Sequence, residues 1–180
     1  GVITNWVSDG NEILYFDEKR FMDNTKSIRG GIPILFPICG NLNTSSSIFG
    51  KNYLKLTQHG FARDSHWRYR LNKSKKSLCL FLNDSQTTKK YYPFDFELRI
   101  EISLKINCLE FEITIQNKTE LAMPINFGMH PYFNISDFKN IDFIDNPVNC
   151  QNQERNVLSN TLDELKNRSE ERRVGKECRS

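Results

Sequence analysis

The chain has 180 residues and carries 25 Lys or Arg against 22 Asp or Glu, a formal net charge of +3. This length suits one domain with a substantial hydrophobic core and is short for two. No run of eighteen apolar residues occurs, so no membrane-spanning helix is predicted. Residues 168–180 supply +2 of the charge, from five Lys or Arg and three Glu. The rest is therefore near neutral, which gives no support to nucleic-acid binding through bulk charge.

The five cysteines are scattered, odd in number and without a C-x-x-C pair. This pattern indicates neither a disulfide framework nor a zinc site, and it predicts reduced thiols in a cytoplasmic protein. The chain opens without a basic-then-apolar leader, as expected for a protein that is not secreted. It also has no metal-ligand spacing, P-loop or G-x-G-x-x-G fingerprint, so neither a metal nor a cofactor is expected.

The first part of the chain predicts three short strands, at 13–16, 67–71 and 78–82. Polar turn residues at 72–74 separate the second strand from the third, and those at 83–85 follow the third. Many short strands with polar turns favour an all-β sandwich over an α/β fold.

The clearest pattern lies between Leu98 and Ile115. Apolar and polar residues alternate up to Ile106, and after Asn107 and Cys108 the alternation resumes at 109–115. A period of two predicts two half-buried strands joined by a short turn, that is, an antiparallel hairpin. Glu110 and Glu112 fall on its polar face and are expected to point outward.

One short helix is expected to begin near Thr161, where Glu164 would complete a capping box. Residues 168–180 then contain a single aliphatic residue and no period of either kind. They resemble translated adaptor sequence. We therefore expect a domain over residues 1–167, followed by an artefactual, disordered tail over 168–180.

Two histidines lie in short motifs that contain Gly or Pro. His59 precedes Gly60, and His130 precedes Pro131. Histidine can give and take protons near neutral pH, and turns shaped by Gly or Pro often carry functional sites. From spacing alone, a functional and a structural role remain equally open for His130. His66, at the start of a predicted strand, is interpreted as a structural or surface residue.

Two arginines, Arg29 and Arg63, have similar settings. Arg29 precedes Gly30 and Gly31, and Arg63 lies shortly after Gly60. A planar guanidinium beside a glycine suits a phosphate or carboxylate, although most arginines are simply solvated. Nearby aromatic residues could stack on a sugar ring but at this density are more often core; they are Trp67, Phe127, Tyr132 and Phe133.

The clusters are far more specific in combination. The order R-G-G-I-P-x-x-F-P, Q-H-G-F-A-R, a β-hairpin and H-P-Y-F resembles the aldose 1-epimerase (galactose mutarotase-like) family, especially its hexose-6-phosphate mutarotase branch. The resemblance covers about residues 1–167. It implies an antiparallel β-supersandwich, incomplete at its C-terminus in this chain. It also implies an enzyme that interconverts the α and β anomers of an aldose without a cofactor.

The resemblance implies roles for five residues. By matching motif positions, His130 is the catalytic acid and His59 holds the sugar. Arg29, Gln58 and Arg63 fall on positions that contact the substrate in the phosphosugar branch, the arginines toward its phosphate. The expected partner is thus a small sugar or sugar phosphate. The family's general base, a glutamate on a late strand, has no counterpart here, so the resemblance implies an inactive fragment.

The main alternative is a noncatalytic carbohydrate-binding or sugar-sensing β-sandwich, which would use the same pocket without needing an acid. A nucleic-acid-binding module is a more distant one. No pattern in the sequence specifies an oligomeric state.

Overall fold

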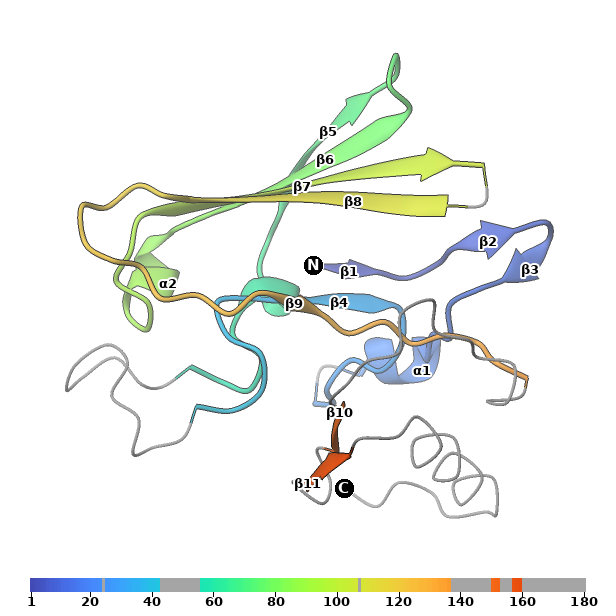
Figure 1. Ribbon diagram of the computed structural model, residues 1–180, viewed down its shortest axis with the longest axis horizontal. Coiled ribbons are helices and arrows are strands. Elements are labelled where there is room, and N and C mark those ends of the chain that lie inside the picture. The colour runs from blue at the N-terminus through green and yellow to red at the C-terminus, as the bar shows by residue number, and fades with distance from the viewer. Residues whose placement is uncertain (24, 43–55, 107, 137–149, 153–156, 160–180) are drawn as a thin grey trace. The chain divides into compact units, whose positions relative to one another are not determined.

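The computed structural model describes residues 1–23, 25–42, 56–106, 108–136, 150–152 and 157–159 (Figure 1). It divides into two compact units, Gly1–Asn134 and Ile135–Ser180. In the second unit, strands β10 (Cys150–Asn152) and β11 (Val157–Ser159) pair antiparallel. The helix predicted near Thr161 and the tail predicted at 168–180 lie outside the described residues. All the site residues predicted from the sequence belong to the first unit.

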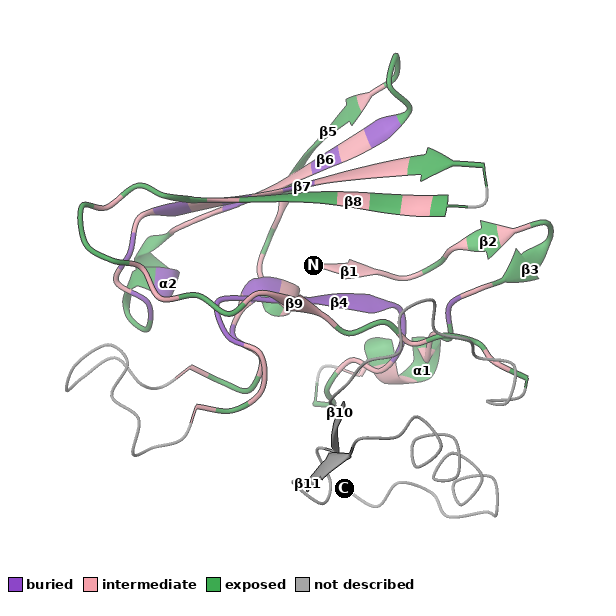
Figure 2. Cartoon of the chain, in the orientation of Figure 1, coloured by how far each residue is buried: buried purple, intermediate pink, exposed green. Residues whose placement is uncertain are grey.

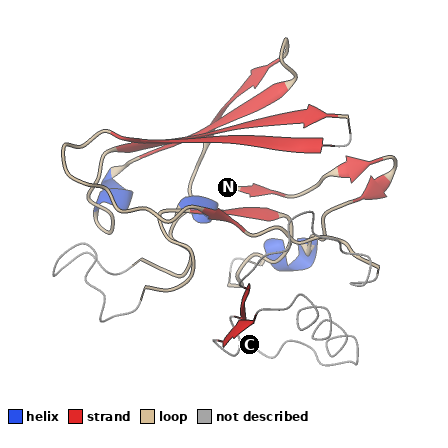
Figure 3. Ribbon diagram, in the orientation of Figure 1, coloured by secondary structure: helices blue, strands red, loops and turns tan. Residues whose placement is uncertain are grey.

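The larger sheet of the first unit has four antiparallel strands in the order β5 (Arg68–Asn72), β6 (Ser77–Asn83), β7 (Phe96–Lys105) and β8 (Cys108–Asn117) (Figure 3). The predicted hairpin is confirmed, because Leu98 pairs with Ile115 and Leu104 with Leu109. Alternation buries Leu98 completely on one face and leaves Glu110 and Glu112 exposed on the other, as predicted.

The second sheet has three strands, with β4 (Ile32–Leu35) between β1 (Val2–Ile3) and β9 (Gly128–Met129). All four residues of β4 are buried (Figure 2). No strand was predicted at these residues, because a short apolar run has no usable period.

Several short elements complete the unit. Strands β2 (Val7–Ser8) and β3 (Asn11–Glu12) form a hairpin, whereas the strand predicted at 13–16 is reduced to isolated bridges from Leu14 to Phe133 and from Phe16 to Gly30. Helices α1 (Glu18–Phe21) and α2 (Gln86–Lys89) were not predicted, because a single turn is too short to show a period. Among the described helices, none is long and apolar enough to cross a membrane.

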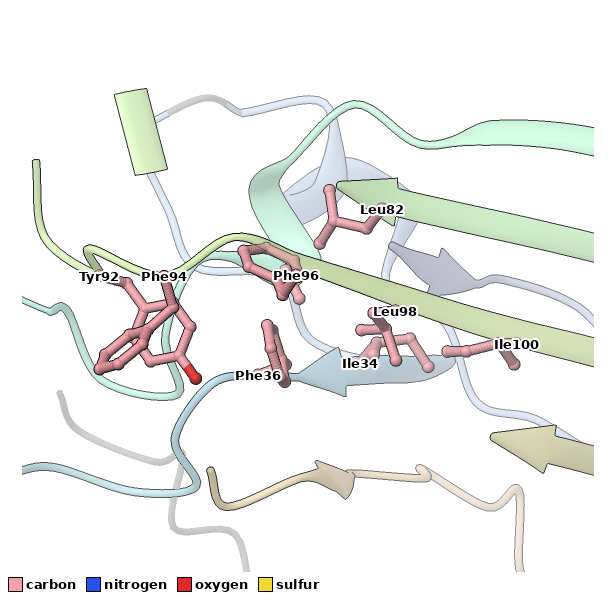
Figure 4. Packing of buried hydrophobic residues seen from close by; sticks show 9 residues of the cluster. Ile34, Phe36, Leu82, Tyr92, Phe94, Phe96, Leu98 and Ile100 are labelled. Atoms are coloured by element: carbon pink, nitrogen blue, oxygen red, sulfur yellow. The ribbon is translucent and has the colours of Figure 1, made fainter. Parts of the chain in front are cut away.

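A hydrophobic core joins the two sheets. Ile34 and Phe36, from β4 and the residue after it, pack against Phe96, Leu98 and Ile100 of β7 (Figure 4). The rings of Phe36 and Phe96 are tilted, with centroids 5.0 Å apart. Full burial of such side chains stabilises the fold by roughly 1.5–3 kcal/mol each. The core therefore fixes β4, and β4 in turn positions the motifs on either side of it.

Candidate active site

Strand β4 connects the two histidine motifs. Its pairing with β9 aligns Leu35 with Gly128. The same register continues to His130, whose backbone N–H donates to the Pro33 carbonyl at 3.1 Å. At the other end of β4, Phe36 forms a parallel bridge with Gly60. Segments separated by about seventy residues in sequence thus meet around one buried strand.

Strand alternation determines which way the His130 motif faces. Met129 packs against the aromatic core, so its neighbour His130 belongs to the opposite face. Tyr132, two residues further on, contacts the His130 ring with centroids 4.7 Å apart and planes at 31°. The sequence favoured a core role for Tyr132. The structure corrects this interpretation, because Tyr132 lies beside His130. The sequence did carry a signal for the contact, since residues two apart on an extended segment face the same side.

The other three aromatic residues considered for stacking on a sugar lie in two different settings. Phe127 and Trp67 are partly buried and pack against the core, in line with the core interpretation. Phe133 is half exposed and does not belong to that cluster.

His59 faces His130 from the position directly before Gly60. The two imidazole centroids are 6.3 Å apart, and the ring planes meet at 68°. The backbone of His59 is left-handed, with φ of 68°, which is uncommon for a residue other than glycine. Two hydrogen bonds with Gly40 hold it: His59 N–H donates to the Gly40 carbonyl at 2.8 Å, and Gly40 N–H donates to His59 Nδ1 at 2.9 Å.

The electrostatic surroundings of His59 favour a neutral ring. Partial burial lowers its pKa first, and the positive charge of Arg63 and the neighbouring His130 lower it further. No carboxylate is hydrogen-bonded or ion-paired to either imidazole within the described part of the chain.

Arg63 lies one turn of 3₁₀ helix beyond His59, in the segment Ala62–Asp64. Its guanidinium donates to the Gln58 carbonyl and contacts the Asp64 carboxylate, both at 3.3 Å, and its side chain is only 20% exposed. Gln58 itself is exposed. Gln58, His59 and Arg63 therefore form one local group.

Arg29 belongs to the opposite side of the site. Its backbone carbonyl accepts the Asp17 N–H, and its half-buried side chain makes no hydrogen bond or ion pair with any described residue. Gly31, two residues on, accepts the N–H of Tyr132 at 2.9 Å. Arg29 is thus joined to the His130 side, whereas Arg63 is joined to the His59 side. Their convergence on one ligand stays a prediction.

The site can therefore offer imidazoles for proton transfer and guanidinium groups for an anion. No group of three or more His, Cys, Asp or Glu that could hold a metal ion occurs among the residues that the structure describes. His66 is exposed, in the segment between Ala62–Asp64 and β5.

Solved structures of similar fold define the class of protein. The Slr1438 protein from Synechocystis sp. PCC 6803 aligns with a TM-score of 0.82 and 37% identity, covering 92% of this chain and 58% of that one. A galactose mutarotase related enzyme from Lactobacillus acidophilus aligns with a TM-score of 0.59 and 31% identity, covering 74% of this chain and 42% of that one. The fold is therefore galactose mutarotase-like.

The family follows from the sequence comparison. The model of the aldose 1-epimerase family matches residues 1–178, so this chain belongs to that family. Two curated relatives are named "Putative glucose-6-phosphate 1-epimerase". The one from Cenchrus ciliaris is 30% identical over 81% of this chain and 47% of its own length, and the one from Salmonella typhimurium is 27% identical over 77% and 44%. The chain spans about half the length of these relatives.

Proposed function

We propose that the protein containing this chain interconverts the α and β anomers of a hexose 6-phosphate. The observation that carries the proposal is the pair His59 and His130, whose rings face each other 6.3 Å apart on either side of β4. Membership of the aldose 1-epimerase family supports the reaction type. The name of the two curated relatives, and the half-buried guanidinium of Arg63 beside His59, support a phosphorylated substrate.

The proposed mechanism is acid–base ring opening. Opening a pyranose requires removal of the proton on the C1 hydroxyl and protonation of the ring oxygen, so an acid and a base must flank one small molecule. His130 would protonate the ring oxygen, and His59 would hold the sugar. Arg29 and Arg63 would bind the phosphate, with Gln58 contacting the sugar beside them.

We also propose that the 180-residue chain is inactive by itself. The resemblance to the family places the general base, a glutamate, on a late strand, and this chain spans about half the length of its curated relatives. The scattered cysteines are the basis for proposing a cytoplasmic location.

The test is exchange spectroscopy on the anomers of glucose 6-phosphate, performed with the product of the complete gene. His130→Gln should slow the exchange about 10²- to 10⁴-fold, the usual contribution of a general acid. His66→Gln is the matched control, because His66 is exposed outside the site, and it should leave the rate unchanged. The 180-residue chain should give no acceleration.

Two other outcomes would contradict the proposal. If the complete protein bound glucose 6-phosphate but did not accelerate exchange, the noncatalytic sugar-binding alternative would replace it. If the 180-residue chain alone accelerated exchange, the inactivity proposal would be wrong, and a base within this chain would have to be sought.

A further inference from the structure

The hydrogen bond from Gly40 to the His59 ring specifies more than the position of that ring. A backbone N–H can only donate, so the ring nitrogen that it meets must be an acceptor. Gly40 N–H lies 2.9 Å from Nδ1. A neutral imidazole has one acceptor nitrogen and one donor nitrogen, so its proton then lies on Nε2.

We propose that the backbone N–H of Gly40 fixes His59 in the Nε2–H tautomer, so that His59 offers a hydrogen-bond donor, and no proton acceptor, to a sugar oxygen. The identity of that ligand rests on the proposed function, whereas the tautomer rests on the structure alone. The two histidines then have separate tasks: His59 donates a fixed hydrogen bond, and His130 is the ring available to transfer a proton. Gly40 is a positioning residue, because it acts through His59.

The groups around His59 favour the same state. Arg63 approaches from the 3₁₀ helix and His130 from the segment after β9, and neither is an anion that could stabilise an imidazolium. Protonation of Nδ1 would also place its N–H directly against the N–H of Gly40, which would break the hydrogen bond. Cys39, next to Gly40 in sequence, is partly buried, and burial raises the pKa of its thiol, so it too stays uncharged near neutral pH.

A second contact holds the backbone of His59 beside Gly40. The N–H of His59 donates to the carbonyl of the same Gly40 at 2.8 Å, so the two residues are joined in both directions. Gly40 has φ of 86°, a left-handed conformation that favours glycine, and a Cβ at this position would meet no atom within 4 Å. An alanine would therefore act through the backbone conformation and not through a clash.

Nitrogen NMR of the 180-residue chain tests the proposal directly. Long-range ¹H–¹⁵N correlations distinguish a pyrrole-type nitrogen, which carries a proton, from a pyridine-type nitrogen, which does not. The chain has three histidines, so His66→Gln and His130→Gln would assign the His59 signals by elimination. We expect a pyrrole-type Nε2 and a pyridine-type Nδ1 for His59 at neutral pH. The opposite assignment, or an average of the two tautomers, would overturn the proposal.

Gly40→Ala and Gly10→Ala form a matched pair for the positioning role. Gly10 lies in the turn between β2 and β3 with φ of 78° and, like Gly40, has no atom within 4 Å of a built Cβ. Gly40→Ala should shift the His59 nitrogens toward the tautomeric average, while Gly10→Ala should leave them unchanged. If the His59 nitrogen signals were the same in both variants, Gly40 would not be the residue that fixes the His59 tautomer.

The outcome is independent of catalysis. If the complete protein does not exchange glucose 6-phosphate anomers, the proposed function fails, but the tautomer measured in this chain still stands. If the exchange is seen and His59 proves to carry its proton on Nδ1, only the present inference fails.

Discussion

Gly60 lies against the backbone of Phe36 more closely than any other residue type would allow. A Cβ atom on residue 60 would stand 2.2 Å from the Phe36 carbonyl oxygen, and the φ of Gly60 is 72°. That carbonyl accepts the N–H groups of Phe61 and Ala62, at 3.0 and 3.2 Å. The close approach therefore attaches the segment that contains His59 and Gly60 to the end of β4.

The first prediction concerns this approach. Gly60→Ala should destabilise the fold by about 2–4 kcal/mol, because it combines a strained left-handed backbone with overpacking. Gly10→Ala introduces the left-handed strain without the clash and should cost about 1–2 kcal/mol. Urea unfolding of both variants gives the comparison. Equal losses would show that the contact with Phe36 relaxes at no cost.

The second prediction concerns the core between the sheets. Phe96 is completely buried against Phe36, so Phe96→Ala should lower the free energy of unfolding by about 3–5 kcal/mol. Tyr69→Ala on β5 is the control, since Tyr69 is 71% exposed, and it should cost about 0.5 kcal/mol or less. Thermal or urea unfolding measures both. Similar losses would mean that Phe96 does not link the two sheets in solution.

The third prediction concerns pH. The pKa of His59 lies below its ordinary value of 6.5 in the folded chain, through burial and the charges of Arg63 and His130. The unfolded chain therefore binds the proton more readily. The stability that the neutral ring contributes is complete above pH 6.5 and is lost as the pH falls from there through the lower folded pKa.

Replacement of His59 by Gln removes this titration. Between about pH 7 and about pH 5, the free energy of unfolding of the parent chain should fall more steeply than that of His59→Gln. Urea unfolding at several pH values measures the two slopes. Parallel slopes would contradict the depressed pKa, whatever their absolute values.

The fourth prediction concerns the phosphate. In the complete protein, the double variant Arg29→Ala, Arg63→Ala should raise KM for glucose 6-phosphate roughly 10²- to 10⁴-fold, because each of the two charged hydrogen bonds contributes about 1.5–3 kcal/mol. KM for glucose should change little. Arg70→Ala, on exposed β5, is the control and should affect neither sugar. A parallel increase for both sugars would assign the arginines to the folding of the site and not to the phosphate.

The sequence predicted those parts of the fold whose physical signal is local. Alternation over Leu98–Ile115 was enough to place β7 and β8 and to assign their faces, since a strand exposes every second residue to the same surroundings. Strands β5 and β6 were predicted within one residue at either end, because polar turns bound them. Residue types also identified the motifs around His59 and His130, and with them the family.

Pairing between distant segments was decided by tertiary structure. Nothing in the run Ile32–Leu35 indicates that it is the central strand of a sheet, because burial on both faces removes the alternation that would mark it. The contact of Tyr132 with His130, and the Gly40 hydrogen bond to His59, depend on which segments lie on either side of that strand. Local chemistry thus determined which side chains could act, and the long-range register of β4 decided which of them meet.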